Sequence, residues 1–292
     1  MPSKRIGVLG ASSFAGQRAL KQLVAQGYEV IAFSRTQQTG GGEVGVIWHQ
    51  LPGADAGAEI IPLSPIEEWL CFAPIWILAD FLPWLQACGV RRIVAFSSTS
   101  RFTKAVGAGS QDPAENALAE RLASSEDALA QWAERHSVNW KVLRPTLIYG
   151  LDQDRNLSEI ARFIRKFGFF PLLGAASGKR QPIHVDDVAA AAVAAIQSSC
   201  PGTRAYNISG GEVLTYREMV CRIFLALKKS PRFLHVPLPV FGVGVRCLSV
   251  LPRYRHWTVS MAERMNRDQE FAHSEAARDF GFSARLFNFD GN

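Results

Sequence analysis

Short apolar runs alternate with stretches of helical spacing through the first half of the chain. The apolar runs have the length and composition of strands and cover residues 4–10, 29–34, 44–51, 69–73, 91–97 and 140–143. The stretches with helical spacing cover residues 14–26, 75–88 and 113–136. This alternation predicts an α/β fold with a Rossmann-type, doubly wound parallel sheet that carries helices on both faces.

The pattern changes near residue 150. Beyond it, helical spacing covers residues 156–167, 185–197, 216–227 and 259–271. Short extended pieces are expected at residues 183–184, 206–208 and 233–236. We therefore expect residues 1–150 to form the sheet domain. Residues 151–292 should form a smaller mixed C-terminal lobe, partly interleaved with the sheet and placed over the carboxyl ends of its strands.

A glycine cluster, GVLGASSFAG, lies between the first expected strand and the first expected helix. Glycine allows a sharp turn and a close approach to a pyrophosphate, whose charge the N-terminus of the next helix attracts. The position between strand and helix makes the motif more specific than a glycine cluster elsewhere. The predicted dinucleotide contacts are Gly10, Ser12, Ser13, Phe14, Ala15 and Gly16.

The end of the second expected strand indicates which dinucleotide is bound. An acidic residue there would accept a hydrogen bond from the ribose 2′-hydroxyl of NAD, whereas a basic residue suits the 2′-phosphate of NADP. This chain has Ser34-Arg35 and no acid beside them. We therefore predict that Ser34 and Arg35 contact the cofactor and that NADP is preferred over NAD.

These features resemble the extended short-chain dehydrogenase/reductase family, and especially its nucleotide-sugar epimerases and dehydratases. Gly10 and Gly16 match the first and third glycines of the family's G-x-x-G-x-x-G, and Ser13 replaces the middle one. The resemblance continues through FSSTS at 96–100, LRPTLIYG at 143–150, Asn156-Leu157, GKRQPIHVDDV at 178–188 and NISGG at 207–211. It covers most of residues 4–227 and rests on the order and spacing of the motifs together.

The resemblance implies roles for further residues and for both parts of the chain. Residues 1–150 would bind the dinucleotide, and residues 151–292 would bind the substrate. Additional cofactor contacts would come from Ala73, Pro74, Ser97, Pro145 and Ile148. The substrate, a nucleotide-diphosphate sugar or a similar phosphorylated molecule, would meet the residues Thr99, Asn156 and Arg180. Thr99 would be the catalytic hydroxyl, and the Arg180 guanidinium can pair two phosphate oxygens at once.

One part of the family's pattern is missing. Its reaction uses a tyrosine four residues before a lysine, because the ammonium lowers the tyrosine pKa and holds the ribose. No tyrosine in this chain has a lysine four residues later, and neither residue type occurs between Lys104 and Lys141. An alignment through Glu126 places Leu118 and Leu122 at the two positions. Ordinary tyrosine-dependent hydride transfer is therefore not expected.

Two functions remain open at this point. In the first, the chain is an epimerase-, dehydratase- or reductase-like oxidoreductase with an altered active site. In the second, it binds a dinucleotide without catalysis and has a structural, assembly or redox-sensing role. The resemblance allows the second, since an accessory subunit of respiratory complex I is a relative that lacks the pair. Whether the chain is an enzyme is left undecided by the sequence.

The histidines and cysteines show no metal-binding or disulfide pattern. The five cysteines have no C-x-x-C spacing, which fits a reducing compartment. No histidine pair has the spacing of metal ligands, so no metal is expected. His184 precedes Asp186-Asp187 and is expected to cap the next helix rather than to catalyse. Residues 1–5 lead directly into the first strand, so no secretory signal is expected and the predicted location is cytoplasmic.

The positive charge is concentrated in the C-terminal quarter of the chain. Residues 217–285 hold 12 Lys/Arg and 6 Asp/Glu, which accounts for the whole net charge of +6. No nucleic-acid recognition motif accompanies this charge. Residues 238–257 combine an apolar run with arginines and Trp257, a composition suited either to a packed helix of the lobe or to peripheral contact with a membrane. A homodimer is a further open alternative.

Overall fold

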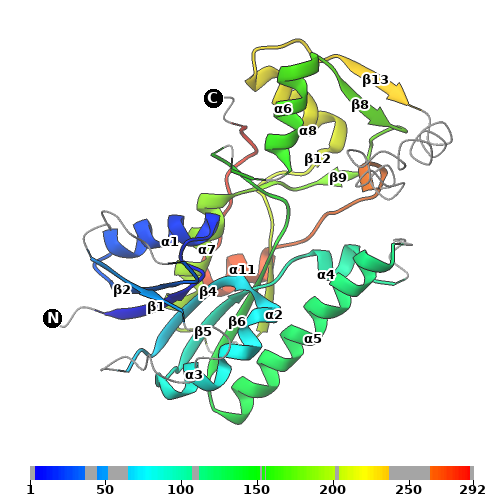
Figure 1. Ribbon diagram of the computed structural model, residues 1–292. Coiled ribbons are helices and arrows are strands. Elements are labelled where there is room, and N and C mark those ends of the chain that lie inside the picture. The colour runs from blue at the N-terminus through cyan, green and yellow to red at the C-terminus, as the bar shows by residue number, and fades with distance from the viewer. Residues whose placement is uncertain are drawn as a thin grey trace.

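A seven-stranded parallel sheet forms the centre of the computed structural model (Figure 1), which describes residues 4–36, 45–51, 65–106, 112–151, 153–154, 156–200, 204–236 and 264–289. The strand order is β11 (Arg204–Ile208), β6 (Asn139–Pro145), β5 (Arg92–Phe96), β4 (Glu68–Pro74), β1 (Arg5–Leu9), β2 (Glu29–Ser34) and β3 (Val46–Gln50). The order reverses between β1 and β4, and β1 pairs in parallel with β2 on one side and with β4 on the other. Open α/β sheets bind ligands outside such a reversal, at the carboxyl ends of the strands. The predicted fold class is confirmed.

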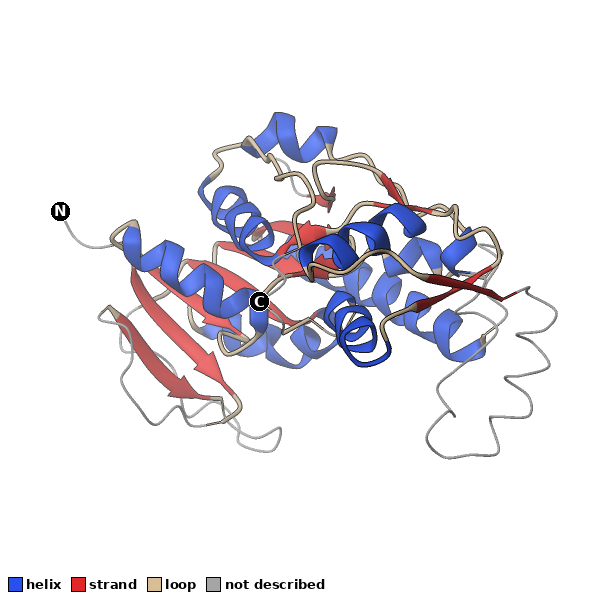
Figure 2. Ribbon diagram, turned by 90° about the horizontal axis from the view of Figure 1, so that it is seen from above, coloured by secondary structure: helices blue, strands red, loops and turns tan. Residues whose placement is uncertain are grey.

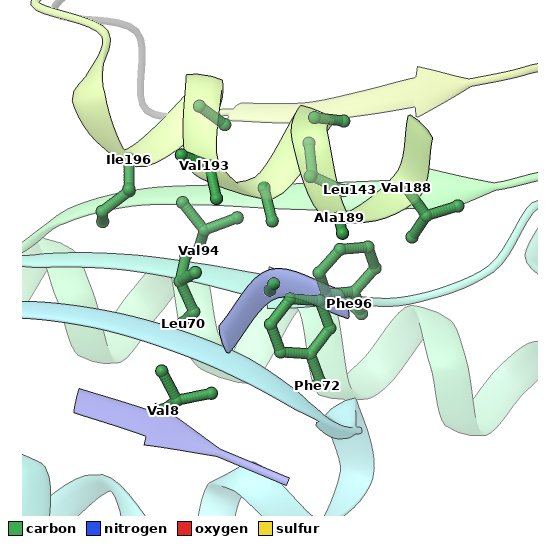
Figure 3. Close-up of a cluster of buried hydrophobic side chains, with 14 of the residues drawn as sticks. Val8, Leu70, Phe72, Val94, Phe96, Leu143, Val188, Ala189, Val193 and Ile196 are labelled. Atoms are coloured by element: carbon green, nitrogen blue, oxygen red, sulfur yellow. The ribbon is translucent and has the colours of Figure 1, made fainter. Parts of the chain in front are cut away.

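Helices cover both faces of this sheet (Figure 2). One face carries α1 (Phe14–Ala25) and α7 (Val185–Gln197), and the other carries α2 (Ile75–Leu78), α3 (Leu82–Ala87) and α5 (Pro113–Arg135). The α7 face is packed with aliphatic and aromatic side chains from alternate strand positions, because successive strand residues point to opposite faces (Figure 3). Both faces of the sheet are therefore buried beneath helices, as is usual for a parallel sheet.

The second half of the chain contributes both to the sheet and to a separate lobe. Helix α7 and strand β11 return to the main sheet, where β11 pairs with β6. The lobe has its own hydrophobic core and appears at the top of Figure 1. Its elements are α6 (Leu157–Phe167), α8 (Tyr216–Ala226) and the strand pairs β8 (Phe170–Leu173) with β13 (Phe233–Val236) and β9 (Lys179–Arg180) with β12 (Leu214–Thr215). The exact division near residue 150 stays a prediction.

The remaining elements are short. They are β7 (Ile148–Tyr149), which pairs with β10 (Ile183–His184), together with α4 (Ser100–Thr103), the 3₁₀ turn η1 (Ala79–Phe81) and α11 (Ser274–Phe280). Hydrogen bonds from Ser97 N–H to the Leu143 carbonyl (2.9 Å) and from Thr146 N–H to the Ile208 carbonyl (3.0 Å) join the segments beyond β5, β6 and β11. The carboxyl ends of these three strands therefore meet at one edge, where the lobe begins.

Two expected helices differ from the observed ones. Residues 75–88 form α2, η1 and α3 in place of one helix; Pro83 lies in the first turn of α3, the position in a helix that tolerates proline. Of residues 259–271, residues 264–266 are helical and 267–271 are not, while 259–263 lie outside the described residues. The segment is extended because its N–H groups bond elsewhere: Gln269 donates to the Lys179 carbonyl (2.9 Å) and Phe271 to Oε1 of Gln181 (2.7 Å).

The segment considered for membrane contact, 238–257, also lies outside the described residues. Among those that are described, no helix combines the length and the apolar composition needed to cross a membrane.

Candidate dinucleotide and substrate site

The turn after β1 brings the backbone of two strands unusually close together. Gly10 has a φ of +70°, and a Cβ atom built on it would lie 2.5 Å from the backbone nitrogen of Ala73. A side chain at Gly10 is therefore excluded twice, by the left-handed conformation and by the contact. Gly16 is equally confined, since its Cβ would lie 2.5 Å from the Gly10 carbonyl oxygen. The loop thus has the compact shape that allows a pyrophosphate to approach the N-terminus of α1.

Ser13, the residue in the place of the family's middle glycine, caps α1. Its Oγ accepts a hydrogen bond from the Gly16 N–H at 3.1 Å. Because the hydroxyl acts as an acceptor here, it keeps its own hydrogen for a further bond. Ser12 is exposed beside it, and Phe14 and Ala15 are half-buried in the first turn of the helix. The structure therefore brings the predicted phosphate-side residues together around one helix N-terminus.

The two residues at the end of β2 that are predicted to select the cofactor have different surroundings. Ser34 is buried, and its Oγ donates to the Thr36 carbonyl at 2.8 Å. Arg35 is exposed, while its carbonyl accepts a bond from Nε2 of Gln50 (3.2 Å). Ser34 therefore shapes the turn, and contact between the exposed Arg35 and a cofactor phosphate stays a prediction.

An apolar pocket of about 350 Å³ opens at the carboxyl ends of β4 and β5. Three predicted cofactor contacts, Ala73, Pro74 and Ser97, line it. The remaining lining residues are Phe72, Ile75, Trp76, Phe96, Ser98, Ser100, Leu118 and Leu122. Leu118 and Leu122, the positions expected for the family's tyrosine and lysine, therefore share one pocket with the predicted cofactor contacts. None of the side chains that line it ionises near neutral pH.

One polar atom of this pocket is unsatisfied. The Oγ of Ser97 is buried and has no hydrogen-bond partner among the described residues. Leaving a buried hydroxyl unpaired costs about 1–3 kcal/mol, so a bound ligand atom that pairs with it would gain affinity. The close glycine turn and this unpaired hydroxyl both fit a bound dinucleotide.

Thr99, the predicted catalytic residue, lies at the start of α4. It is buried, and its Oγ1 donates to the Pro145 carbonyl at 3.1 Å. Pro145 is buried at the end of β6, and Ile148 is half-buried in β7. Thr99 and Pro145 are thus in contact, although the hydroxyl hydrogen of Thr99 is directed to protein rather than to a ligand in this conformation.

A second pocket, of about 280 Å³, is charged where the first is apolar. Glu115, at the start of α5, forms ion pairs across it with Arg264 (2.9 Å) and Lys104 (3.5 Å). The complete lining is Phe102, Thr103, Glu115, Arg264, Arg267, Asp268, Gln269, Glu270 and Phe271. The sequence reasoning did not single out Arg264, Arg267 or Asp268, because it placed them inside a helix. The local excess of arginine and lysine in residues 217–285 was the available signal.

The two predicted phosphate ligands of the substrate lie in different surroundings. Asn156 is exposed at the N-terminus of α6. Arg180 is buried, and its guanidinium donates to the carbonyls of Lys179 (2.6 Å) and Arg267 (2.8 Å) and to that of Arg264. Burial lowers the pKa of Arg180 to about 10. Arg180 therefore attaches the wall of the charged pocket to β9, and direct contact with a substrate stays a prediction for both residues.

His184 performs the capping role expected of it. Its Nδ1 accepts a bond from the Asp186 N–H at 3.2 Å at the start of α7. Its ring meets Tyr149 edge-on with centroids 5.2 Å apart, and the Tyr149 hydroxyl accepts a bond from the Asn288 N–H at 3.2 Å. Both side chains are buried parts of the packing beneath the lobe.

Within the described ranges, no group of three His, Cys, Asp or Glu side chains could hold a metal ion.

Residues 77–209 match the model of a family described as the NAD dependent epimerase/dehydratase family. The resemblance to this extended short-chain dehydrogenase/reductase family is confirmed. Among curated proteins, the chain is 34% identical over 100 residues to subunit 9 of the NADH dehydrogenase [ubiquinone] 1 alpha subcomplex, mitochondrial, of Arabidopsis thaliana. That alignment covers 34% of this chain, which spans only 25% of the Arabidopsis protein.

A second relative aligns along nearly the whole length of both proteins. It is the 2-alkyl-3-oxoalkanoate reductase of Stenotrophomonas maltophilia, 26% identical over 318 residues, with 95% of this chain and 94% of the reductase covered. The chain is thus similar to proteins of epimerase, dehydratase and reductase type.

Solved structures share the fold at low identity. The UDP-glucose 4-epimerase of Thermotoga maritima with UDP-glucose has a TM-score of 0.68 at 18% identity, covering 96% of this chain and 93% of its own. MoeE5 in complex with UDP-glucuronic acid and NAD has a TM-score of 0.72 at 19% identity, with 97% and 94% covered. The dTDP-glucose 4,6-dehydratase of Bacillus anthracis in complex with NAD has a TM-score of 0.69 at 14% identity, with 99% and 94% covered.

Proposed function

We propose that the protein binds NAD or NADP at the β1–α1 turn and a phosphorylated small molecule, of the nucleotide-diphosphate sugar kind, in the charged pocket. The active site between them is altered, since it lacks the tyrosine and lysine of the family. The observation that carries this proposal is the shared lining of the apolar pocket, where Ala73, Pro74 and Ser97 meet Leu118 and Leu122.

The residues fit a dinucleotide in three respects. The turn at Gly10 leaves room for phosphate beside the N-terminus of α1, and the Ser13 hydroxyl can donate to it. The buried Oγ of Ser97 needs a partner. When bound, the nicotinamide would supply hydride transfer. The chain would bind the cofactor and exclude water through the apolar walls of the pocket. It would lack the family's lysine that holds the ribose.

The charged pocket fits an anionic substrate because arginine side chains pair phosphate oxygens in a planar fork. Arg264 and Arg267 supply two guanidinium groups, and Phe102 and Phe271 add aromatic surface. Helices α4 and α5 form walls of both pockets, so a ligand in one pocket lies next to a ligand in the other. The named ligands of the solved relatives, UDP-glucose and UDP-glucuronic acid, have this chemistry.

The cofactor preference rests on Arg35. It is exposed at the end of β2, and the strand's own acid, Glu29, lies at the opposite end. A guanidinium at this place would pair with a 2′-phosphate, so we propose that NADP is preferred over NAD.

A second candidate function is dinucleotide binding without catalysis. The specific observation in its favour is that no described side chain lining the apolar pocket can exchange a proton at neutral pH. The partial likeness to a subunit of a mitochondrial NADH dehydrogenase also supports it.

A titration of the purified protein with NADPH, NADH, NADP and NAD tests both candidates, with thermal stability and nicotinamide fluorescence as readouts. A nucleotide at a hundred times its dissociation constant should raise the free energy of unfolding by about 2.7 kcal/mol. Arg35→Ala should weaken the binding of NADPH more than that of NADH. Arg135→Ala, which removes an exposed arginine from α5, should change neither affinity. If none of the four nucleotides binds, both candidates fail.

Turnover then separates the candidates. Saturated protein would be incubated with UDP-glucose, UDP-glucuronic acid and dTDP-glucose, and the products analysed by chromatography. Epimerised, dehydrated or oxidised sugar supports the altered enzyme. Binding of the dinucleotide with no product and no sugar-nucleotide binding supports the non-catalytic protein.

A further inference from the structure

The C-terminal ends of α6 and α8 meet at one end of the lobe (Figure 1). Lys229, just beyond α8, donates from Nζ to the carbonyls of Ile164 (3.2 Å) and Arg165 (3.0 Å) in the last turn of α6. Lys229 thus joins the segment after α8 to the end of α6, and we call residues 162–169 and 225–232 the lobe tip. It is far along the chain from the residues that line the two pockets.

The lobe tip exposes large apolar side chains. Phe167 is 50% exposed and Leu225 is 63% exposed. Phe167 packs against Phe163 with ring centroids 4.6 Å apart, and Phe169 extends the group at 6.4 Å. Single exposed apolar residues are common, but here an aromatic group at the end of α6 and a leucine at the end of the adjoining α8 are both exposed.

The lobe tip is rich in basic residues, and acids are missing from both stretches of chain. Lys166 lies over the Phe167 ring, with Nζ 5.1 Å from its centroid. The other cations of the tip are Arg162, Arg165, Lys228, Lys229 and Arg232. Arg162 pairs with Glu159 at 2.5 Å. In the sequence, no Asp or Glu occurs from residue 160 to 185 or from 219 to 262.

Part of this charge has a role within the lobe. Cations stabilise helix C-termini, and Lys229 does so through its bonds to the last carbonyls of α6. That role needs one lysine. It accounts neither for the exposed Phe167 and Leu225 nor for the further exposed cations Lys166, Lys228 and Arg232.

We propose that the lobe tip is a docking surface for an anionic lipid bilayer. Long basic side chains place their charge at lipid phosphates while their stems, and the neighbouring ring and leucine, enter the boundary of the acyl chains. The absence of acids from these stretches matches the negative surface of such a membrane. The proposal concerns attachment to a membrane surface and is independent of whether the pockets bind a dinucleotide.

Co-sedimentation of the full chain with vesicles tests the proposal. Vesicles of phosphatidylcholine alone are compared with vesicles that also contain phosphatidylglycerol, at low and at raised salt. The chain should sediment with the anionic vesicles only, and raised salt should release it. Failure to sediment with anionic vesicles at low salt would overturn the proposal.

Two variants with the same change in net charge locate the surface. K166E/K228E reverses two cations of the tip, and K4E/R135E reverses two exposed cations of the sheet domain. Each basic residue near an anionic membrane contributes a factor of roughly five in affinity, so the tip variant should lose at least ~25-fold. The sheet-domain variant should lose much less. Equal losses in the two variants would overturn the assignment to the tip.

The apolar part has its own test. F167S/L225S keeps the charge and should reduce binding to anionic vesicles several-fold, with an unchanged far-ultraviolet circular dichroism spectrum. Sedimentation velocity without vesicles provides the competing outcome. If the chain is a dimer that F167S/L225S converts to monomer, the tip is an interface between two copies and the membrane proposal is wrong.

Discussion

The two pockets beside α5 differ in chemistry although one stripe of one helix contributes to both. Glu115 faces the charged pocket, and Leu118 and Leu122 follow at helical spacing and face the apolar one. The charged pocket holds arginines and carboxylates, whereas the polar side-chain groups among the described residues that line the apolar pocket are serine hydroxyls and the indole N–H of Trp76. The two linings therefore differ in charge: the described residues of the charged pocket carry ionised groups suited to an anionic ligand, whereas those of the apolar pocket do not.

The largest expected effect is a loss of stability at the glycine turn of the proposed dinucleotide site. Gly10→Ala should lower the free energy of unfolding by roughly 2–4 kcal/mol, because its Cβ would meet the Ala73 backbone nitrogen at 2.5 Å and its φ is +70°. Gly27→Ala is the matched control, since Gly27 has a φ of +81° but nothing within 4 Å of the added atom. The control should lose about 1 kcal/mol. Urea unfolding measures both, and equal losses would show that the close approach of β1 and β4 is unimportant.

The next largest effect is a loss of ligand affinity at the charged pocket. Arg264→Ala should weaken UDP-glucose binding by about 10- to 100-fold, since hydrogen bonds to charged groups contribute about 1.5–3 kcal/mol. Arg278→Ala removes an exposed arginine from α11 and should leave affinity unchanged. Isothermal titration calorimetry compares the three proteins. Unchanged affinity in Arg264→Ala would remove the charged pocket from the proposed substrate site.

The apolar pocket can be made to resemble the family's active site. Leu118→Tyr with Leu122→Lys restores the missing pair in a pocket that already contains Ser97. We expect NADPH to bind roughly tenfold more tightly, because a lysine can hold the ribose hydroxyls through a charge-assisted bond. Burying the new lysine should also lower the melting temperature of the unliganded protein, since Leu122 is 3% exposed.

Leu118→Phe with Leu122→Met controls for side-chain size and should not increase affinity. If the Tyr–Lys variant binds NADPH no better than this control, the two leucines are not beside the ribose.

The smallest effect is a dependence of stability on pH near the charged pocket. Burial lowers the pKa of His273 below its usual value of 6.5, and its Nδ1 lies 2.7 Å from Oγ of Ser209. The unfolded chain therefore takes up the proton at a higher pH than the folded chain does. The contribution of neutral His273 is complete above pH 6.5 and is lost as the pH falls from 6.5 toward the lowered pKa. Urea unfolding across this range should show a shallower decline in His273→Asn than in the unmodified chain, and identical slopes would contradict the assignment.

The sequence predicted the elements whose pattern is local. Strand β2, Glu29–Ser34, and helix α7, Val185–Gln197, were predicted with the observed bounds, because a short apolar run and a small-residue helix need no distant partner to be recognised. The sequence also predicts that the second half interleaves with the sheet, and in the structure β11 pairs with β6.

Contacts between distant residues could not be predicted in this way. The extended form of residues 267–271 depends on Lys179, Arg180 and Gln181, roughly ninety positions earlier in the chain, so helical spacing alone was misleading. The same distance hid the charged pocket, whose two sides come from α5 and from this segment. By contrast, the grouping of Leu118 and Leu122 with Ser97 followed from an alignment through Glu126 on the same helix.

The guanidinium of Arg180 has a consequence for how ligand binding could be detected. It ties the Arg264 and Arg267 carbonyls to β9, so this side chain supplies part of the attachment between one wall of the charged pocket and the rest of the protein. A ligand that contacts this wall together with Glu115 and Phe102 would add a further attachment. Its binding would therefore be recorded as slower amide hydrogen exchange in residues 264–271, even where it leaves the global melting temperature unchanged.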